Sequence, residues 1–205
     1  MVRIGVIFYS TYGHSWRLAE QIALGAKAGG ATSVEIKRIR ETLPDEIVGK
    51  AGGLEVRKQW WHHPEITPND LLNYDGIAIG GPTRFGIVSS QLKAYLDSLG
   101  GLWARDALVG KFATVFGCSQ TQHGGNETNL LSTMIPLYHL GFVLSGLPYS
   151  FKGQTTDTEI VGGSPLGITS IAGSARQVSK LELEGAHFQG KHLVEVMTKY
   201  GKPRS

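Results

Sequence analysis

An apolar run over residues 2–9 leads into a polar loop over residues 10–15 and then into a helical pattern, and this stretch constrains the fold more than any other. The run is rich in β-branched and aromatic side chains, which suit a strand buried on both faces in the middle of a parallel sheet. In the helical pattern Leu18 and Ile22, each followed by an alanine, recur at the spacing of a core-facing stripe. A buried strand that passes through a short loop into a helix is typical of an α/β fold.

The loop over residues 10–15 lies at the carboxyl end of the predicted strand and at the amino end of the predicted helix. Free backbone N–H groups and the positive end of the helix dipole favour a phosphate at such a place. The loop has neither the G-x-G-x-x-G pattern nor the Gly-Lys-Ser/Thr ending of a nucleoside triphosphate loop, so it offers hydroxyl donors but no lysine. From the loop alone, a phosphate cradle and a plain turn in which Ser15 caps the helix are equally open.

Length and composition place the chain among ordinary globular proteins. With 205 residues, 41% of them hydrophobic and 18% charged, residues 1–205 are predicted to form a single domain. No apolar run approaches the roughly 18 residues of a membrane-spanning helix, and the run over residues 2–9 is too short for a signal peptide. The single cysteine, Cys118, excludes an internal disulfide and fits a reducing compartment, so we expect a cytoplasmic protein.

The distribution of charge argues against two classes of partner. The net charge is +3 and the pI is near 9.0, but Lys and Arg are scattered and no basic run with interleaved aromatic residues occurs. No nucleic-acid partner is therefore expected. An electron carrier that docks on basic redox proteins would be expected to present an acidic face, and the sequence offers no acidic cluster of that kind.

A second strand is predicted over residues 34–39, and its mixture of apolar and basic side chains places it near the edge of the sheet. A short helix near residues 45–50 and a surface loop up to residue 74 follow, because prolines interrupt this segment. His62 and His63 in that loop could ligate a metal, but no cysteine or acidic cluster at zinc spacing accompanies them. We therefore expect no metal site, and a loop that is solvated or contacts another subunit.

A second polar loop, residues 82–86, follows the buried strand predicted over residues 76–81. In a doubly wound sheet the carboxyl ends of the first and third strands converge on one crevice, so the two loops should meet there. A proline-initiated turn into the helix predicted over residues 89–98 is the alternative. Such a turn does not explain the pair Arg84 and Phe85, which can give a planar anionic ring a fixed positive donor and an aromatic wall.

The fourth strand, predicted over residues 113–116, opens into a long polar loop, residues 117–127, whose glycines allow backbone groups to approach the edge of a heterocycle. The remaining predicted elements are a helix over residues 126–137, a fifth strand over 141–147, a glycine-rich loop over 154–173 and a closing helix over 182–200. Strands and helices thus alternate along the chain. The pattern predicts a doubly wound parallel sheet of five strands in the order 2-1-3-4-5, with helices on both faces.

Five short motifs occur in a fixed order between residue 3 and about residue 200. They are Ser-Thr-Tyr-Gly-His, Pro-Thr-Arg-Phe-Gly, Gly-Gly-Leu-Trp, Thr-Gln-His-Gly-Gly and a late Gly-Gly-Ser-Pro. In these motifs and their order the chain resembles the WrbA-type NAD(P)H:quinone oxidoreductases of the flavodoxin-like family. The resemblance implies a flavodoxin-like fold, FMN as cofactor, NADH or NADPH as co-substrate, two-electron reduction of quinones by a ping-pong mechanism, and a homotetramer.

The resemblance also assigns roles to residues of this chain. The residues that would hold the FMN phosphate are Ser10, Thr11, Tyr12, Gly13, His14 and Ser15. The residues that would border the isoalloxazine ring are Pro82, Thr83, Arg84, Phe85, Gly86, Ser119, Gln120, Thr121, Gln122, His123, Gly124 and His139. His139 and Trp103 would line the face where the substrates react, with Tyr12 near the nicotinamide nucleotide.

Residue chemistry alone leaves two of these roles open. Trp103 suits a hydrophobic core as well as a pocket wall. His139 could be a structural histidine at a helix end, or could donate a hydrogen bond or proton to a developing quinolate. Three residues depart from the family pattern without removing a donor that flavin binding obviously requires, namely Cys118, Gln120 and Leu166.

Two other functions and one assembly remain as hypotheses. The protein could be a flavodoxin-like one-electron carrier or a partner-binding regulatory flavoprotein instead of a quinone reductase. The homotetramer implied by the resemblance agrees with an apparent surplus of tryptophans, because Trp60, Trp61 and Trp103 are more than the core of one small α/β layer needs.

Overall fold

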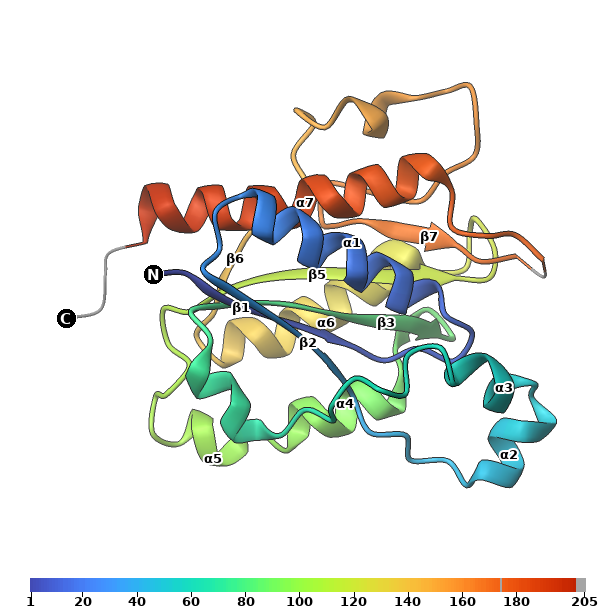
Figure 1. Ribbon diagram of the computed structural model, residues 1–205, viewed down its shortest axis with the longest axis horizontal. Coiled ribbons are helices and arrows are strands. Elements are labelled where there is room, and N and C mark those ends of the chain that lie inside the picture. Colours follow the sequence, from blue (N-terminus) through green and yellow to red (C-terminus); the bar gives the residue numbers. More distant parts are fainter. Residues whose placement is uncertain (174, 202–205) are drawn as a thin grey trace.

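The computed structural model describes residues 1–173 and 175–201. One twisted sheet runs through the middle and carries helices on both faces (Figure 1). The strands are β1 (Arg3–Phe8), β2 (Ser33–Arg38), β3 (Gly76–Arg84), β4 (Ile87–Val88), β5 (Phe112–Ser119), β6 (Val143–Leu144) and β7 (Thr169–Ile171). The helices are α1 (His14–Ala28), α2 (Asp45–Lys50), α3 (Gly53–Arg57), α4 (Ser90–Asp97), α5 (Gly100–Trp103), α6 (Asn126–His139) and α7 (Lys180–Tyr200). Two 3₁₀ turns lie at Pro68–Asn73 and Lys152–Thr155.

Parallel strands follow one another in the order β2-β1-β3-β5-β6, which confirms the predicted α/β fold and the order 2-1-3-4-5. β1 lies inside the sheet, where Ile4 pairs with Val34 of β2 on one side and with Gly76 of β3 on the other. Because these strands are parallel, the carboxyl ends of β1, β3 and β5 lie along the same edge. That edge carries the loops predicted to form the site.

β1 sends alternate side chains to the two faces of the sheet, as a strand must. Ile4, Val6 and Phe8 belong to the core beneath α1 and α7, whereas Ile7 faces the core shared with α4, α5 and α6. All four side chains are completely buried. The apolar run at the start of the chain is therefore buried on both faces, as the sequence predicts.

α1 and α7 lie side by side on one face of the sheet (Figure 1), and their backbones touch. A Cβ atom on Gly25 of α1 would lie 1.8 Å from the carbonyl oxygen of His187, and one on Gly190 of α7 would lie 2.0 Å from that of Ile22. Neither position has room for a side chain. Glycine at these two positions therefore fixes α1, whose N-terminus faces the site, against the long C-terminal helix.

The fifth strand differs from the prediction. Of the predicted residues 141–147, the pair Val143–Leu144 lies beside the start of β5, while β7, inside the predicted glycine-rich loop, lies beside its end. Residues 145–168 leave the sheet as an insertion between the two strands (Figure 1). Gln189 of α7 bridges the break, because its side-chain amide donates to the Val115 carbonyl oxygen (2.8 Å) and accepts from the Ile168 N–H (2.6 Å). A side-chain amide carries the same donor and acceptor as a peptide group and so completes the pairing where the strand stops.

The helices agree closely with the sequence. α2 has the bounds predicted for a short helix, and α4, α6 and α7 begin within two residues of the predicted starts. α3 is an addition, since the sequence predicts surface loop there. Among the described residues, none of the helices combines the length and the apolar character that crossing a membrane would require.

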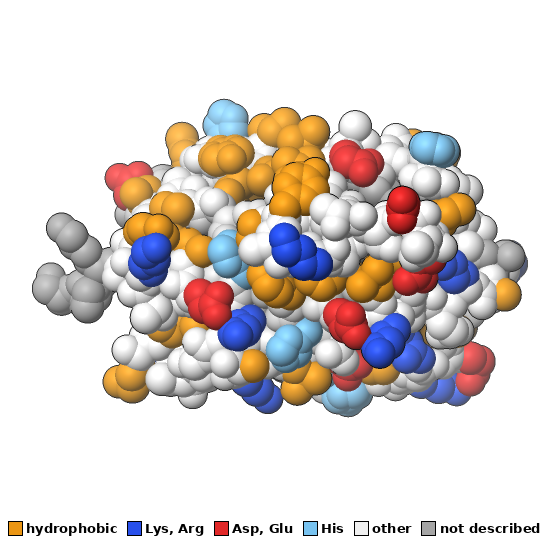
Figure 2. Space-filling model, turned by 90° about the horizontal axis from the view of Figure 1, so that it is seen from above, with side chains coloured by type: hydrophobic (Ala, Val, Ile, Leu, Met, Phe, Trp, Pro, Cys, Tyr) orange, Lys and Arg blue, Asp and Glu red, His pale blue; other side chains and the backbone are white. Residues whose placement is uncertain are grey.

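The face that carries α7 and the insertion has no large patch of positive or of negative charge. Figure 2 shows Lys and Arg side chains there interspersed with Asp and Glu, and hydrophobic side chains gathered toward one side. Several of the charges on α7 form ion pairs one helical turn apart, among them Lys180 with Glu184 and Lys191 with Glu195. Such surface pairs contribute little to stability, but they keep the local potential low.

Candidate functional site

A cavity of about 960 Å³ opens at the edge of the sheet where β1, β3, β5 and β7 end. The three predicted loops meet on its wall, joined by α3 and by the segment that follows β7. The sequence-predicted residues that it brings together are those at positions 10–14, 82–85, 119–121 and 124. A cavity of this size accommodates a mononucleotide and leaves room beside it.

Four predicted site residues lie near this cavity without lining it. Ser15 is completely buried behind the first loop, and Gly86 occupies the turn of the β3–β4 hairpin. Gln122 and His123 line a separate cavity of about 340 Å³ on the other side of the third loop. The structure therefore divides the predicted third loop between two cavities.

Trp103 and His139 do not reach the cavity of their own chain. They are the last residues of α5 and α6, and both helices end near the start of β5, at the edge of the sheet opposite the cavity. α6 begins beside the cavity and runs away from it, so its last residue is carried to the far edge. The predicted roles of these two residues are not met within a single chain.

The first loop leaves the N-terminus of α1 open. The residue before the helix is Gly13, with φ of +96°, and no side chain caps the helix. Gly13 donates its N–H to Ser10 Oγ (3.0 Å), and the Ser15 hydroxyl lies 3.3 Å from the thiol of Cys118. The plain turn in which Ser15 caps the helix is therefore wrong, because Ser15 lies inside the helix and faces the sheet. The uncapped N-terminus favours an anion.

The second loop is a tight hairpin. β3 does not stop before Pro82 as predicted but continues through Pro82, paired with Cys118, to Arg84. Phe85 and Gly86 then form a two-residue turn into β4, with φ of +53° and +86°. Positive φ at both positions is what a type I′ hairpin turn requires. The Phe85 side chain projects into solvent from this backbone conformation, which is unfavourable for a non-glycine residue.

A chain of polar contacts ties the hairpin to the first loop. Arg84 donates from Nη2 to the hydroxyl oxygen of Thr11 (2.9 Å). Beneath Thr11 lies Tyr9, whose hydroxyl donates to a carboxylate oxygen of Glu41 (2.8 Å). Burial raises the pKa of the Tyr9 phenol, so it remains a neutral hydrogen-bond donor at physiological pH. Arg84 is therefore held across the mouth of the cavity rather than free in solvent.

The third loop packs directly on the hairpin. Gly125, with φ of +86°, precedes α6, and a Cβ atom there would lie 2.5 Å from the Cα of Gly86. Thr128 of α6 donates its hydroxyl to the Gly86 carbonyl oxygen (2.6 Å). The second and third loops therefore form one rigid wall, and a shift of one would move the other.

A fourth wall, formed by residues 172–173 and 175–177, is absent from the sequence prediction. The N–H groups of Ala172 and Gly173 donate to the carbonyl oxygens of Ser119 and Gln120 (2.7 and 2.8 Å), so the pairing of β5 with β7 continues past the strand ends. The β-branched residues of β7 are the sequence signal that could have revealed this strand. α3 and Arg17 also line the cavity and were not predicted to do so.

Glu182 holds the fourth wall in place. Its completely buried carboxylate accepts hydrogen bonds from the backbone N–H groups of Gly162, Ile171 and Ser179 and from the Ser170 hydroxyl. Arg176 donates to both of its oxygens (2.9 and 3.1 Å). The carbonyl oxygen of Arg176 in turn lies 2.8 Å from the ring nitrogen of His14 in the first loop. The buried charge is thus compensated, and the fourth wall is joined to the first.

The charges on the cavity wall are all positive. Arg17, Arg84 and Arg176 line it, and among the described residues its wall contains no aspartate or glutamate. A cavity with this charge distribution attracts an anionic ligand and repels a cationic one. Together with the open N-terminus of α1, it favours a phosphate compound.

We expect the thiol of Cys118 to be inert in the folded protein. Burial raises the pKa of the thiol to about 11, and its Sγ lies against the Ser15 hydroxyl. Since the thiolate is the reacting form, a disulfide reagent at pH 8 should titrate far less than one thiol per chain in native protein and one in urea. Rapid reaction of native protein would show that this part of the cavity opens to solvent.

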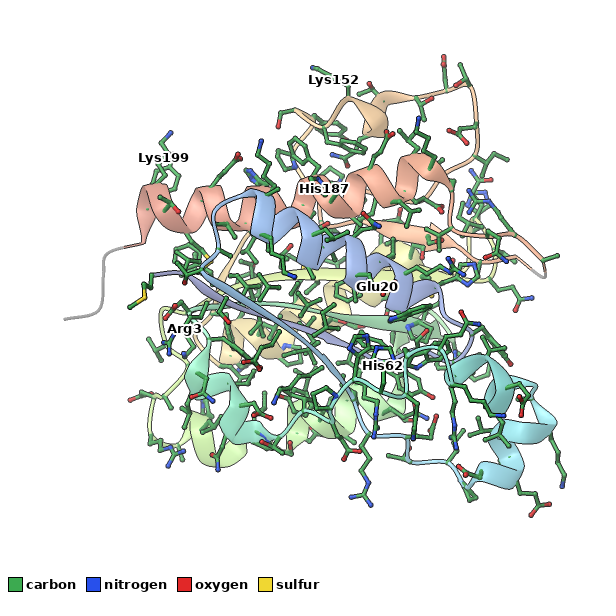
Figure 3. The ribbon with its side chains drawn as sticks, in the orientation of Figure 1. Arg3, Glu20, His62, Lys152, His187 and Lys199 are labelled. Carbon is green, nitrogen blue, oxygen red and sulfur yellow. The ribbon has the colours of Figure 1, made fainter. Side chains whose placement is uncertain are left out.

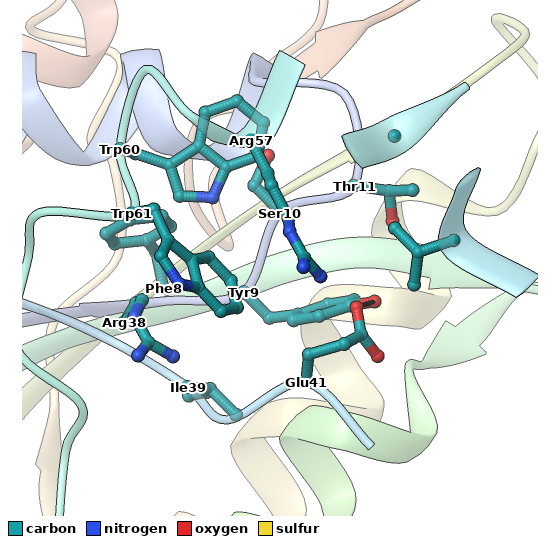
Figure 4. Close-up of a pocket in the computed structure, with 12 residues that line it drawn as sticks. Phe8, Tyr9, Ser10, Thr11, Arg38, Ile39, Glu41, Arg57, Trp60 and Trp61 are labelled. Atoms are coloured by element: carbon teal, nitrogen blue, oxygen red, sulfur yellow. Dashed lines mark hydrogen bonds between the residues drawn. The ribbon is translucent and has the colours of Figure 1, made fainter. Parts of the chain in front are cut away.

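The tryptophans do not behave as one group. Trp60 is almost fully buried and packs on Trp16 of α1, with ring centroids 5.6 Å apart, so it is a core residue and not a surplus one. Trp61 lies between the guanidinium groups of Arg38 and Arg57, which sit 4.0 and 4.3 Å from its ring (Figure 4). This arrangement fastens α3 to the end of β2, behind the first loop.

The adjacent histidines serve packing. Their rings lie 4.2 Å apart, and His63 accepts a hydrogen bond from the indole N–H of Trp16 (3.3 Å). Burial lowers the pKa of His63, which leaves its nitrogen free to accept. His62 interacts electrostatically with Glu20 of α1 (Figure 3). The described residues hold no group of three or more His, Cys, Asp or Glu side chains suited to a metal ion.

Comparison with known proteins gives a family and close relatives. Residues 6–141 match the model of the flavodoxin family. The chain is 49% identical over 201 residues to the NAD(P)H dehydrogenase (quinone) of Cupriavidus metallidurans, with 97% of this chain and 98% of the relative covered. It is 46% identical over 205 residues to the protein of the same name from Methanosarcina acetivorans, with the same coverage.

Solved structures share the fold at low sequence identity. A flavodoxin described as a WrbA-like protein, from Agrobacterium tumefaciens, superposes with a TM-score of 0.67 at 20% identity, covering 98% of this chain and 99% of the other. A flavodoxin from the domain Archaea gives a TM-score of 0.61 at 14% identity, covering 96% and 99%. Likeness at this level of identity concerns the arrangement of the strands and helices.

Proposed function

We propose that this chain, which belongs to the flavodoxin family, reduces quinones to hydroquinones with electrons from NAD(P)H, and that FMN is the flavin that it uses. Relatives with nearly half of their residues identical over almost their full length are NAD(P)H dehydrogenases (quinone). The cavity itself is the observation that supports FMN. Its wall contains the uncapped N-terminus of α1 and, among the described residues, no acidic side chain, and both features favour a phosphate group. Residues 1–205 would act as one functional unit.

The residues present fit FMN. The uncapped α1 N-terminus and the side chains of Ser10 and Thr11 would hold the phosphate. Arg84 and Phe85 would border one edge of the ring system, and the segment after β5 the other. When bound, FMN would supply the hydride and two-electron chemistry that links the nicotinamide nucleotide to the quinone.

The protein's own contribution is to bind, orient and exclude water. The contacts among Arg84, Thr11 and the part-buried pair Tyr9 and Glu41 hold the donors in place before a ligand arrives, which reduces the entropy cost of binding. Phe85 extends the apolar wall at the rim, where a planar substrate can stack. Because one open face serves both substrates, they would have to alternate, as in a ping-pong mechanism.

We further propose a homotetramer in which a second copy brings His139 and Trp103 to the cavity. Both side chains are exposed. Leu131, Ile135 and Tyr138 form an exposed apolar stripe on α6 at a spacing of four and three residues. Sedimentation at micromolar concentration should give a tetramer, and a monomer with full quinone reductase activity would contradict this assembly.

Anaerobic titration tests the activity. Protein loaded with FMN is titrated with NADH, and the flavin absorbance near 450 nm should be lost; benzoquinone should then restore it, with NADH oxidised in equal amount. In a one-electron carrier, NADH alone would not reduce the flavin, and the absorbance near 450 nm would persist. A regulatory flavoprotein would show neither step, so either result would contradict the proposal. We also propose a cytoplasmic location, which the free thiol of Cys118 supports.

A further inference from the structure

The three arginines on the cavity wall differ in the hydrogen bonds that their guanidinium groups make. Arg84 donates to Thr11, and Arg176 donates to Glu182 and to two backbone carbonyl oxygens. The guanidinium of Arg17 makes no hydrogen bond or ion pair with the described residues. Its side chain makes a distant cation–π contact with Trp16 (5.7 Å) and interacts electrostatically with Glu20. Arg17 therefore presents unused donors at the cavity.

Arg17 stands directly over the first loop. It is the fourth residue of α1, and its backbone N–H makes the first hydrogen bond of the helix, to the Gly13 carbonyl oxygen (2.9 Å). Side chains on a helix lean toward its N-terminus, so a residue at this position covers the turn that precedes it. Gly13, His14 and Arg17 accordingly line the cavity together.

The first loop itself contains neither lysine nor arginine. Of its four hydroxyls, that of Ser15 is completely buried and turned toward Cys118, and that of Tyr12 donates to a backbone carbonyl oxygen. The remaining donors are the hydroxyls of Ser10 and Thr11 and the backbone N–H groups of the uncapped helix. A phosphate monoester carries close to two negative charges at neutral pH. Its charge would therefore be incompletely balanced by the loop alone.

We propose that Arg17 is a cationic clamp for the phosphate monoester of FMN, completing the first loop from one turn inside α1. The proposal rests on the proposed use of FMN and goes beyond it, because it adds an arginine to a loop whose predicted residues include neither lysine nor arginine. NADPH also carries a phosphate monoester. The position of Arg17 over the α1 N-terminus assigns it to the flavin, and the experiment separates the two sources.

The test compares flavins with and without the phosphate. Protein freed of flavin is titrated with FMN and with riboflavin, following flavin fluorescence. Arg17→Gln should weaken FMN binding about tenfold, equivalent to about 1.4 kcal/mol, and change riboflavin binding less than about twofold. Arg17→Lys should recover most of the FMN affinity. The FMN dissociation constant of the unchanged protein should also rise more steeply with NaCl than that of Arg17→Gln.

Lys199→Gln is the matched control, because it removes one positive charge at the far end of α7 (Figure 3) and should leave both flavins unaffected. Three results would overturn the clamp: FMN binding unchanged in Arg17→Gln, equal loss of FMN and riboflavin, or a raised KM for NADPH but not NADH with FMN binding intact. If the unchanged protein does not bind FMN at all, the proposed function falls with it. If it binds FMN and oxidises NADH normally, only the clamp is at stake.

Discussion

Replacing Gly125 with valine should disrupt both the fold and the proposed flavin site. Gly125 adopts φ of +86°, which valine adopts only with strain, and a Cβ there would lie 2.5 Å from the Gly86 Cα and 2.9 Å from the Thr128 hydroxyl. Backbone strain and overpacking against main-chain atoms should together lower the free energy of unfolding by about 3–5 kcal/mol. Urea unfolding followed by circular dichroism measures this.

The same change should weaken flavin binding more than the loss of a single contact would. Gly125 is where the third loop rests on the Phe85–Gly86 turn, so a valine must push the two loops apart. We expect FMN affinity to fall at least about 100-fold where the protein remains folded, because misplaced donors lose their hydrogen bonds together. Gly100→Ala is the control, since a Cβ at Gly100 meets nothing within 4 Å. A Gly125→Val protein with normal unfolding and FMN affinity would show that the loops are not in contact.

Glu182→Gln should have a comparable effect through a different cause. The Glu182 carboxylate is completely buried and compensates Arg176 while accepting several backbone N–H groups. The glutamine amide has nearly the volume of the carboxylate but no charge. Its NH₂ group would also face backbone N–H groups that need an acceptor. Breaking a buried ion pair by neutralising one partner costs about 3–5 kcal/mol, so we expect a loss of that size in the free energy of unfolding.

The control for this change lies on the same helix. Glu184 is exposed and pairs only loosely with Lys180 (3.7 Å), so Glu184→Gln should alter stability by less than about 0.5 kcal/mol. Glu182→Gln should also weaken FMN binding, since the Glu182 carboxylate holds Arg176 of the fourth wall. Unchanged flavin affinity in a clearly destabilised protein would show that the fourth wall does not contribute to the site.

Local pattern predicted most of the fold. The double burial of β1, the edge position of β2 and the core-facing stripe of α1 follow from side-chain periodicity, which depends only on neighbouring residues. Alternation of these elements then restricts a parallel sheet to few topologies, and the predicted order was confirmed. The interrupted fifth strand was missed because Gln189 completes its pairing from a helix that is distant in sequence.

The candidate site divides in the same way. The motif over residues 10–15 and the pair Arg84 and Phe85 could be predicted, because a loop that follows a parallel strand must lie at its carboxyl end. The sequence could not predict which side chains face the cavity. Ser15 turns inward to Cys118, whereas Arg17 lines the cavity. Those orientations follow from helix rotation and from packing against the sheet.

The sequence by itself determined the fold class, the strand order and the placement of the first two loops at one edge of the sheet, because periodicity and chain direction act locally. Only the tertiary structure decided that Trp60 belongs to the core, that the segment after β7 forms a fourth wall through residues 172–173 and 175–177, and that Trp103 and His139 lie away from their own cavity. Each of these depends on contacts between segments far apart in the chain. Such contacts are set by the packing of whole elements, which no local pattern encodes.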